Sequence, residues 1–174
     1  MGVLNIRPTA AGDSCEWQSQ VGSACPNHWD NVEGEPPSGS NPVNYASGDA
    51  WVTDLYNFAN HTTEADGIIK IEVYLYAQPG WTVDRPSMKA AIRIGGTTYE
   101  GSEITLTTLK WYDPYEWAVN PYTGLAWTWT DIDNLQAGAA GRSMYSLDNT
   151  KQTIWGGIKV LVTYGPRWGF ATWK

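Results

Sequence analysis

Apolar and polar residues alternate with a period of two in several segments, and this pattern is the strongest constraint on the fold. In residues 68–76 the apolar side chains share one face: Ile69, Ile71, Val73 and Leu75. The opposite face carries Lys70, Glu72, Tyr74 and Tyr76. Successive side chains of a strand point to opposite faces of a sheet, so this alternation predicts a half-buried β-strand. The same reasoning predicts strands over residues 88–94, 103–108 and 158–164, with further strands over 3–7, 51–58, 112–119 and around 143–147.

Turn-forming residues separate the predicted strands. Gly95-Gly96 predicts a tight hairpin, and Asn120-Pro121-Tyr122-Thr123-Gly124 predicts a longer turn. One short helix is expected near residues 130–137, with Thr130 as its N-cap and Gly138 after its last turn. Many short strands punctuated in this way predict an all-β fold, namely an antiparallel jelly-roll β-sandwich with one short helix.

The length of 174 residues suits one hydrophobic core. A single jelly-roll β-sandwich domain is therefore expected over residues 1–164. Residues 165–174 form an aromatic C-terminal tail that contains Trp168, Phe170 and Trp173. Exposure of so many aromatic side chains to water is unfavourable, so this tail is expected to be an interface segment.

The charge balance excludes several classes of partner. The formal net charge of −7 disfavours binding to phosphate backbones and to anionic lipid surfaces. No window approaches the roughly 18 apolar residues of a membrane span. The N-terminus lacks the basic segment and apolar run of a secretory signal. We therefore expect no nucleic-acid partner, no membrane partner and synthesis in the cytoplasm.

The sequence contains two cysteines, Cys15 and Cys25, in one loop-like region. They are expected either to remain thiols or to form a disulfide that closes a short loop, and the sequence leaves both alternatives open. A zinc site is disfavoured, because His28 is the only other soft ligand nearby and zinc takes four ligands.

Groups suited to catalysis do not converge. The two histidines, His28 and His61, lie in polar loop contexts, and no nucleophile elbow or phosphate-binding glycine loop occurs. Acids such as Glu100 and Glu103 have no feature that marks a glycosidase pair. We therefore expect no enzyme activity, no catalytic residue and no cofactor.

Calcium is the one ion with candidate oxygen ligands. They are Asp30, Glu33 and Glu35 in one segment, and Asp131 and Asp133 in another. The first set lacks the spacing of an EF-hand loop, and the second is explained by capping of the short helix. Calcium binding therefore stays a minor alternative to the absence of a cofactor.

Aromatic side chains are the strongest remaining signal. With 11 tryptophans and 10 tyrosines, the chain has more large rings than one core of this size needs. Trp127 and Trp129 alternate with Thr128, so one strand face is expected to present both indoles. Surplus indoles can stack on sugar rings, as in carbohydrate-binding modules, or be buried between subunits. Because the aromatic residues are spread along the chain and into the tail, interfaces are favoured.

Several segments together resemble a known family. They are Leu4-Asn5-Ile6-Arg7-Pro8, Asp54-Leu55-Tyr56-Asn57-Phe58, Ile92 to Gly101, Leu106-Thr107-Thr108 and Asn120 to Gly138. In this order they resemble a family of largely uncharacterised proteins from the structural genes of tailed bacteriophages and related viruses. The resemblance covers most of the chain, and residues 120–129 are its most specific part. It implies a jelly-roll virion protein, such as a capsid decoration, neck or tail-fibre component, with no catalytic residues to carry over.

The leading hypothesis is therefore a structural virion protein that assembles through aromatic and loop contacts with copies of itself and with other virion proteins. It would be made in the host cytoplasm and located in the virion. The alternative is a carbohydrate-binding module that acts in glycan or host-surface recognition, and the two roles are compatible because fold does not fix function. A glycoside-active enzyme on the same scaffold is a third hypothesis.

Overall fold

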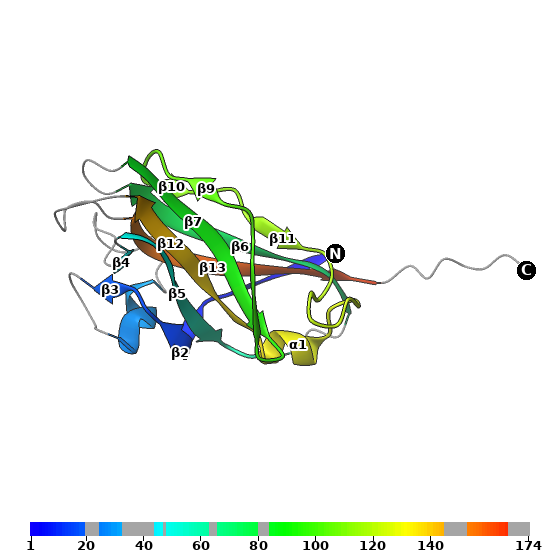
Figure 1. Ribbon diagram of the computed structural model, residues 1–174. Coiled ribbons are helices and arrows are strands. Elements are labelled where there is room, and N and C mark those ends of the chain that lie inside the picture. The colour runs from blue at the N-terminus through cyan, green and yellow to red at the C-terminus, as the bar shows by residue number, and fades with distance from the viewer. Residues whose placement is uncertain are drawn as a thin grey trace, which may run out of the picture.

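The computed structural model describes residues 1–19, 25–32, 44–46, 48–62, 66–79, 84–144 and 153–166. Two β-sheets, here called sheet A and sheet B, pack face to face as a sandwich (Figure 1). Each strand pair that is described runs antiparallel. The predicted all-β antiparallel sandwich is therefore confirmed, whereas its jelly-roll connectivity stays a prediction.

Sheet A has the strand order β10-β6-β13-β4-β3, with β11 also on β6 and β1 also on β13. Its strands are β1 (Gly2–Ile6), β3 (Gln18–Ser19), β4 (Asn44–Ala46), β6 (Gly67–Pro79), β10 (Lys110–Trp111), β11 (Tyr115–Trp117) and β13 (Thr153–Gly165). Sheet B has the order β2-β5-β12-β7-β8, with β9 also on β7. Its strands are β2 (Pro8–Cys15), β5 (Gly48–Phe58), β7 (Asp84–Ile94), β8 (Thr97–Glu100), β9 (Ile104–Thr105) and β12 (Gln136–Met144).

The core lies between the two sheets and is built largely by the alternating segments. The predicted inward positions that are buried include Ile71, Val73, Leu75, Met88, Ala90, Ile92, Ile158, Val160 and Val162. Removing a large aliphatic side chain from water contributes about 1.5–3 kcal/mol, so these alternating faces provide much of the driving force for folding.

Ile69 is an exception to the predicted alternation. The register of β6 against β13 shifts between the Thr163–Lys70 pair and the Tyr164–Ile68 pair, so β6 has one extra residue there. Such a bulge turns the following side chains to the opposite face. Ile68 is consequently buried, and Ile69 is 41% exposed.

Strand β12 was not predicted over most of its length, because residues 136–137 were expected in the helix and the next strand near 143. It lies between β5 and β7 and pairs with both (Figure 1). Its sequence, QAGAAGRSM, is poor in the β-branched and aromatic residues that favour strands. Small residues are nevertheless required, because a Cβ on Gly138 would meet the backbone carbonyl of Asp54 and a Cβ on Gly141 would meet the Trp17 indole.

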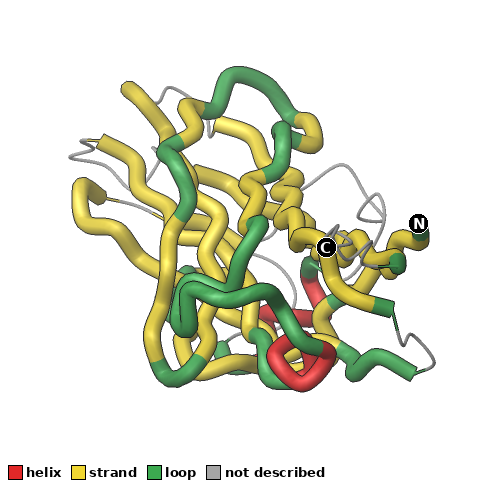
Figure 2. The backbone as a smooth tube through the Cα atoms, turned by 90° about the vertical axis from the view of Figure 1, so that its right-hand side faces the viewer, coloured by secondary structure: helices red, strands yellow, loops and turns green. Residues whose placement is uncertain are grey.

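The short helix is confirmed, but its bounds are shifted. Helix α1 (Trp129–Asp133) begins after Thr128, whose side chain accepts a hydrogen bond from the Asp131 N–H in a reciprocal capping box. The N-cap is therefore Thr128 rather than Thr130, and the C-cap is Asn134 rather than a residue next to Gly138. As Figure 2 shows, α1 lies at one end of the sandwich.

A 3-10 helix, η1 (Asn27–Asn31), packs beside β2. Gly95 and Gly96 have φ angles of 59° and 79°, and they form the predicted tight turn between β7 and β8. No helix in the described part of the chain is long and apolar enough to cross a membrane.

Candidate functional site

The tryptophans divide by burial. Four lie in the core: Trp17, Trp117, Trp127 and Trp155. Four more are half-buried: Trp29, Trp51, Trp111 and Trp129. The side chains of Trp81, Trp168 and Trp173, and that of Phe170, lie outside the described residues. Half-buried indoles therefore exist, as the composition suggested. Of the predicted set, Trp129 is half-buried, Trp127 is buried, and Trp168, Phe170 and Trp173 lie outside the described residues.

Trp127 is a core residue, so the expectation that its indole lies on an exposed strand face is wrong. Its side chain is 1% exposed, and its Nε1–H donates to the Trp117 carbonyl oxygen at 3.0 Å. Residues 127 and 128 belong to the connection that leads into α1 rather than to a strand, so their side chains do not alternate across a sheet. The Trp127 ring therefore has no free face for a ligand.

Trp129, the first residue of α1, is half-buried and belongs to a small cluster of side chains at that end of the sandwich. Its ring stacks on His61 with centroids 4.9 Å apart, and it meets Tyr164 edge to face at 5.5 Å. His61 also contacts Asp133, with its Nδ1 2.8 Å from the Asp133 Oδ1. Both ring neighbours use surface of the Trp129 indole, so this cluster anchors α1 rather than offering a flat binding surface.

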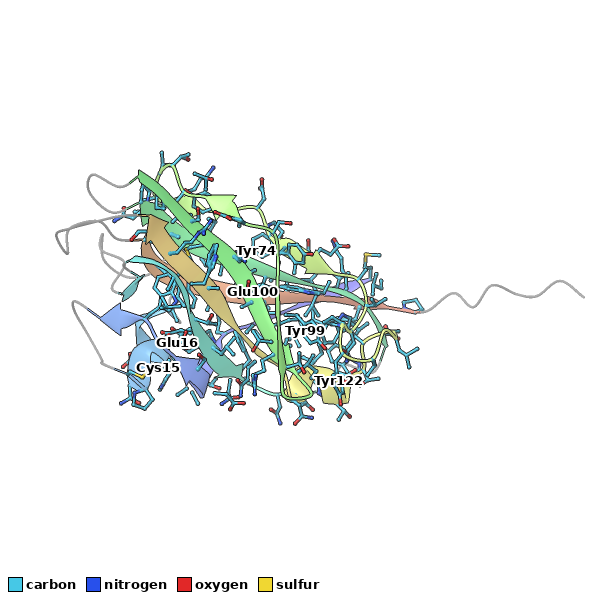
Figure 3. The ribbon with its side chains drawn as sticks, in the orientation of Figure 1. Cys15, Glu16, Tyr74, Tyr99, Glu100 and Tyr122 are labelled. Atoms are coloured by element: carbon cyan, nitrogen blue, oxygen red, sulfur yellow. A yellow bond between two sulfur atoms is a disulfide. The ribbon has the colours of Figure 1, made fainter. Side chains whose placement is uncertain are left out.

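A grouping of aromatic side chains with polar neighbours lies on the outer face of sheet A. We call it the Trp111 face and define it by Arg7, Tyr74, Tyr76, Trp111 and Lys159. All five side chains are half-buried, and Figure 3 labels Tyr74 among the side chains on the ribbon. Strands β6, β10 and β13 contribute to this face, together with the residue that follows β1, so its members are far apart in the sequence.

Strand pairing explains how these residues meet. Tyr74 and Tyr76 are two residues apart on β6, so they point to the same side of the sheet. Lys159 lies directly opposite Tyr74, and Trp111 lies directly opposite Tyr76. Their inward neighbours on β6 are buried core residues, so the whole set faces outward.

Tyr112 holds Trp111 in position. Its side chain is buried, and its backbone N–H donates to the Leu75 carbonyl oxygen at 2.9 Å. Its hydroxyl accepts from the Thr107 N–H at 2.8 Å and donates to the Thr108 carbonyl oxygen at 2.8 Å. Because the neighbouring residue is anchored on three sides, the Trp111 ring is placed by the sheet and not by a free loop.

Cations and rings are interleaved on the Trp111 face. The Lys159 Nζ is 4.6 Å from the Trp111 ring centroid and 5.2 Å from the Tyr74 centroid. The Arg7 guanidinium carbon is 5.8 Å from the Trp111 centroid, and its Nη1 donates to the Ile158 carbonyl oxygen at 3.1 Å. Trp111 and Tyr76 are tilted at 50° with centroids 5.3 Å apart. Each cation–π contact is worth about 0.5–1 kcal/mol at such exposure, so together they hold the rings in place.

The Tyr74 phenol stays protonated on this face. Burial raises the pKa of Tyr74, and the nearby carboxylates of Glu72 and Asp113 raise it further, while Lys70 opposes them. A neutral phenol can both donate and accept a hydrogen bond. The Trp111 face therefore combines flat rings, a hydroxyl and cationic donors.

The outer face of sheet B is built differently around Trp51. Lys89 and Arg142 lie over its ring at 4.2 Å and 4.6 Å from the centroid. Both cations also pair with acids, Lys89 with Glu100 at 2.7 Å and Arg142 with Glu103 at 3.0 Å. Trp51 is thus a single ring within a set of ion pairs, whereas the Trp111 face groups three rings.

A rigid loop near α1 presents exposed apolar side chains. Asn120 is fully buried, and its Oδ1 accepts from the Tyr122 and Thr123 N–H groups at 2.9 and 3.4 Å. Its backbone also bonds to Leu125 and Gly124, at 2.8 Å each. The loop is therefore ordered while Tyr122 and Leu125 are 55% and 68% exposed. Figure 3 labels Tyr122 at this end of the molecule.

The remaining predicted site residues have mixed outcomes. Cys15 and Cys25 form a disulfide with their Cα atoms 6.0 Å apart, which settles the alternative that the sequence left open. Within the described ranges, no group of three or more His, Cys, Asp or Glu residues is arranged to hold a metal ion. Asp131 caps α1 and Asp133 binds His61, while Glu33 and Glu35 lie outside the described residues.

The alternation in residues 68–76 placed Tyr74 and Tyr76 on the outward face of their strand but gave them no role. Two aromatic residues at positions i and i+2 on a polar strand face were the available signal. The contribution of Trp111, Lys159 and Arg7 depends on strand pairing between distant segments, which the sequence pattern does not reveal. Comparison with protein-family models, with curated proteins and with solved structures finds no match for this chain.

Proposed function

We propose that this protein is a non-catalytic recognition domain that binds glycans on the Trp111 face. The observation that carries the proposal is the grouping of Tyr74, Tyr76 and Trp111 with Lys159 on one outer sheet face. Aromatic rings carry negative potential on their faces, which attracts the polarised C–H groups of a sugar ring. The neighbouring hydroxyls and cations supply hydrogen bonds to sugar hydroxyl groups.

The rigidity of this face supports the same proposal. Trp111 lies beside the buried Tyr112, and Tyr74 and Tyr76 lie on a strand whose other face forms the core. Binding to side chains that are already ordered loses little conformational entropy. A shallow platform of this kind suits an extended polysaccharide better than a small enclosed ligand.

Calorimetric titration against a panel of soluble polysaccharides tests the proposal. The panel includes neutral β-glucans, α-glucans and xylans together with acidic uronans. Trp111→Ala is expected to weaken binding roughly 30-fold, since truncation of a hot-spot aromatic costs about 2 kcal/mol or more. Trp51→Ala is the matched control, because it removes the same side chain from beneath two cations on the opposite outer face.

A glycan ligand that loses affinity with Trp111→Ala and keeps it with Trp51→Ala supports the proposal. Absence of binding across the panel at millimolar protein concentration overturns it. Equal losses in the two variants also overturn it, because the effect would then not be specific to the Trp111 face. Salt titration separates ring stacking from simple ion exchange, since only the latter falls steeply with ionic strength.

A second candidate function is the virion building block that the sequence resemblance suggests. The loop around Asn120 favours it, because ordered, solvent-exposed Tyr122 and Leu125 are the kind of side chains that anchor protein interfaces. Co-sedimentation of the protein with virus particles tests this role, with Leu125→Lys as the variant that should release it. Particles purified without any copy of this chain would refute it.

A further inference from the structure

Strand β1 (Gly2–Ile6) forms an open edge of sheet A. It pairs with β13 from Gly2–Tyr164 to Ile6–Val160, and no described strand pairs with its other side. Val3 and Met1 are 58% and 91% exposed, and Leu4 is half-buried at the rim of the core. An open edge carries backbone N–H and C=O groups that can pair with another extended strand.

The other described edges carry features that discourage such pairing. Strands β3, β9 and β10 are two residues long and β11 three, and β10 and β11 include Lys110 and Glu116. Strand β2 begins at Pro8 and has two register shifts against β5. Strand β8 ends at Glu100. By contrast β1, with the sequence GVLNI, has no charge and no proline, and no register shift interrupts its pairing with β13.

We propose that β1 pairs antiparallel with β1 of a second copy of this chain and so forms a two-fold dimer. Antiparallel pairing of a strand with itself is always self-complementary, since a two-fold axis brings the same backbone groups together. With the axis at Leu4, the two Leu4 residues face each other, and each Val3 faces the other copy's Asn5. This contact covers apolar side chains at the N-terminal edge.

Charge explains why a second copy can approach at this edge. The chain carries a net charge of −7, so two copies repel each other over most orientations. Strand β1 itself is uncharged, and residues 1–12 contain no acidic side chain. Edge-to-edge contact at β1 therefore avoids opposing acidic side chains.

The dimer has a consequence for glycan recognition, and this step alone rests on the proposed function. A two-fold axis perpendicular to the plane of the paired strands joins sheet A of one copy to sheet A of the other. The outer faces of these two copies of sheet A then lie on the same side. Two Trp111 faces would then look in one direction from a continuous sheet. Binding of one polymer at both faces raises the apparent affinity by about 100-fold or more, provided that the polymer spans the distance.

Analytical ultracentrifugation over a range of concentrations tests the pairing without any ligand. The unmodified protein is expected to show a monomer–dimer equilibrium. Val3→Lys should weaken the dimer about tenfold, because an edge lysine opposes strand addition and the side chain is exposed in the monomer. Val119→Lys is the matched control, since it makes the same substitution at another exposed valine, 49% exposed, and should leave the dimer unchanged.

Hydrogen exchange of the amides in residues 2–6 locates the contact. Their protection is expected to rise with protein concentration in the unmodified protein and not in Val3→Lys. A protein that stays monomeric up to millimolar concentration overturns the proposal. So does a dimer that survives Val3→Lys or leaves the amides of residues 2–6 unprotected. Glycan affinity of the Val3→Lys monomer is measured separately, so failure of dimerisation and failure of glycan binding remain distinguishable.

Discussion

Replacing Trp127 by alanine tests most directly how the aromatic residues of this protein are used. An interface indole that is exposed in the free protein can be truncated with little effect on folding. A core indole cannot, because its removal leaves a cavity that the neighbouring side chains fill only in part. Trp127 is 1% exposed, so the structure predicts the second outcome.

The expected loss follows from what the indole contacts. Truncation of a buried aromatic side chain to alanine costs about 3–5 kcal/mol. Loss of the hydrogen bond from Nε1 also leaves the Trp117 carbonyl oxygen without its indole donor in a buried region. A loss of about 4 kcal/mol lowers Tm by about 8–16 °C in a domain of this size. Trp127→Phe keeps most of the volume and should lose about half as much.

Urea denaturation followed by far-UV circular dichroism measures the effect independently of tryptophan fluorescence. Trp129→Ala is the matched control, because that indole is half-buried and loses a ring contact with His61 and a hydrogen bond to the Asp66 carbonyl oxygen. It should cost about 1–2 kcal/mol. The reasoning is refuted if Trp127→Ala unfolds at the urea concentration of the unmodified protein, or if Trp129→Ala is the more damaging change.

Three further predictions concern stability. The fully buried Asp54 accepts hydrogen bonds from two backbone N–H groups at 2.5 and 2.8 Å, so Asp54→Ala should cost about 3 kcal/mol or more in urea denaturation, and Asp54→Asn less. Burial alone would raise the pKa of Asp133, but hydrogen bonds from His61 outweigh it and hold that pKa below its usual value. The stabilisation from this carboxylate is therefore complete above about pH 4 and is lost as the pH falls through the lowered pKa. In thermal melts between pH 5 and 2, the Tm of His61→Ala should therefore fall less than the Tm of the unmodified protein. Gly138→Val forces a Cβ against a backbone carbonyl and should prevent soluble expression, whereas Gly96→Ala, with open space around it, should cost only about 1 kcal/mol for its positive φ.

The amino-acid sequence by itself determined the strands whose side chains alternate strictly. Ile71, Val73 and Leu75 on β6, and Val160 and Val162 on β13, are buried as their period of two predicts. The glycine pair between β7 and β8 and the position of a short helix were equally local properties. These features need no knowledge of the partner strand, because burial of one face and the freedom of glycine at positive φ are decided within a few residues.

Only the tertiary structure decided the rest. Strand β12 is a strand because β5 and β7 pair with it on both sides, against its own weak propensity, and Gly138 and Gly141 have no room for a Cβ. Trp127 is in the core because the connection into α1 places its indole N–H against the Trp117 carbonyl oxygen. The Trp111 face and the open edge of β1 exist because β6 and β13 bring distant segments into register. A periodic pattern specifies which side of a strand is apolar, but the pairing of strands specifies which residues become neighbours.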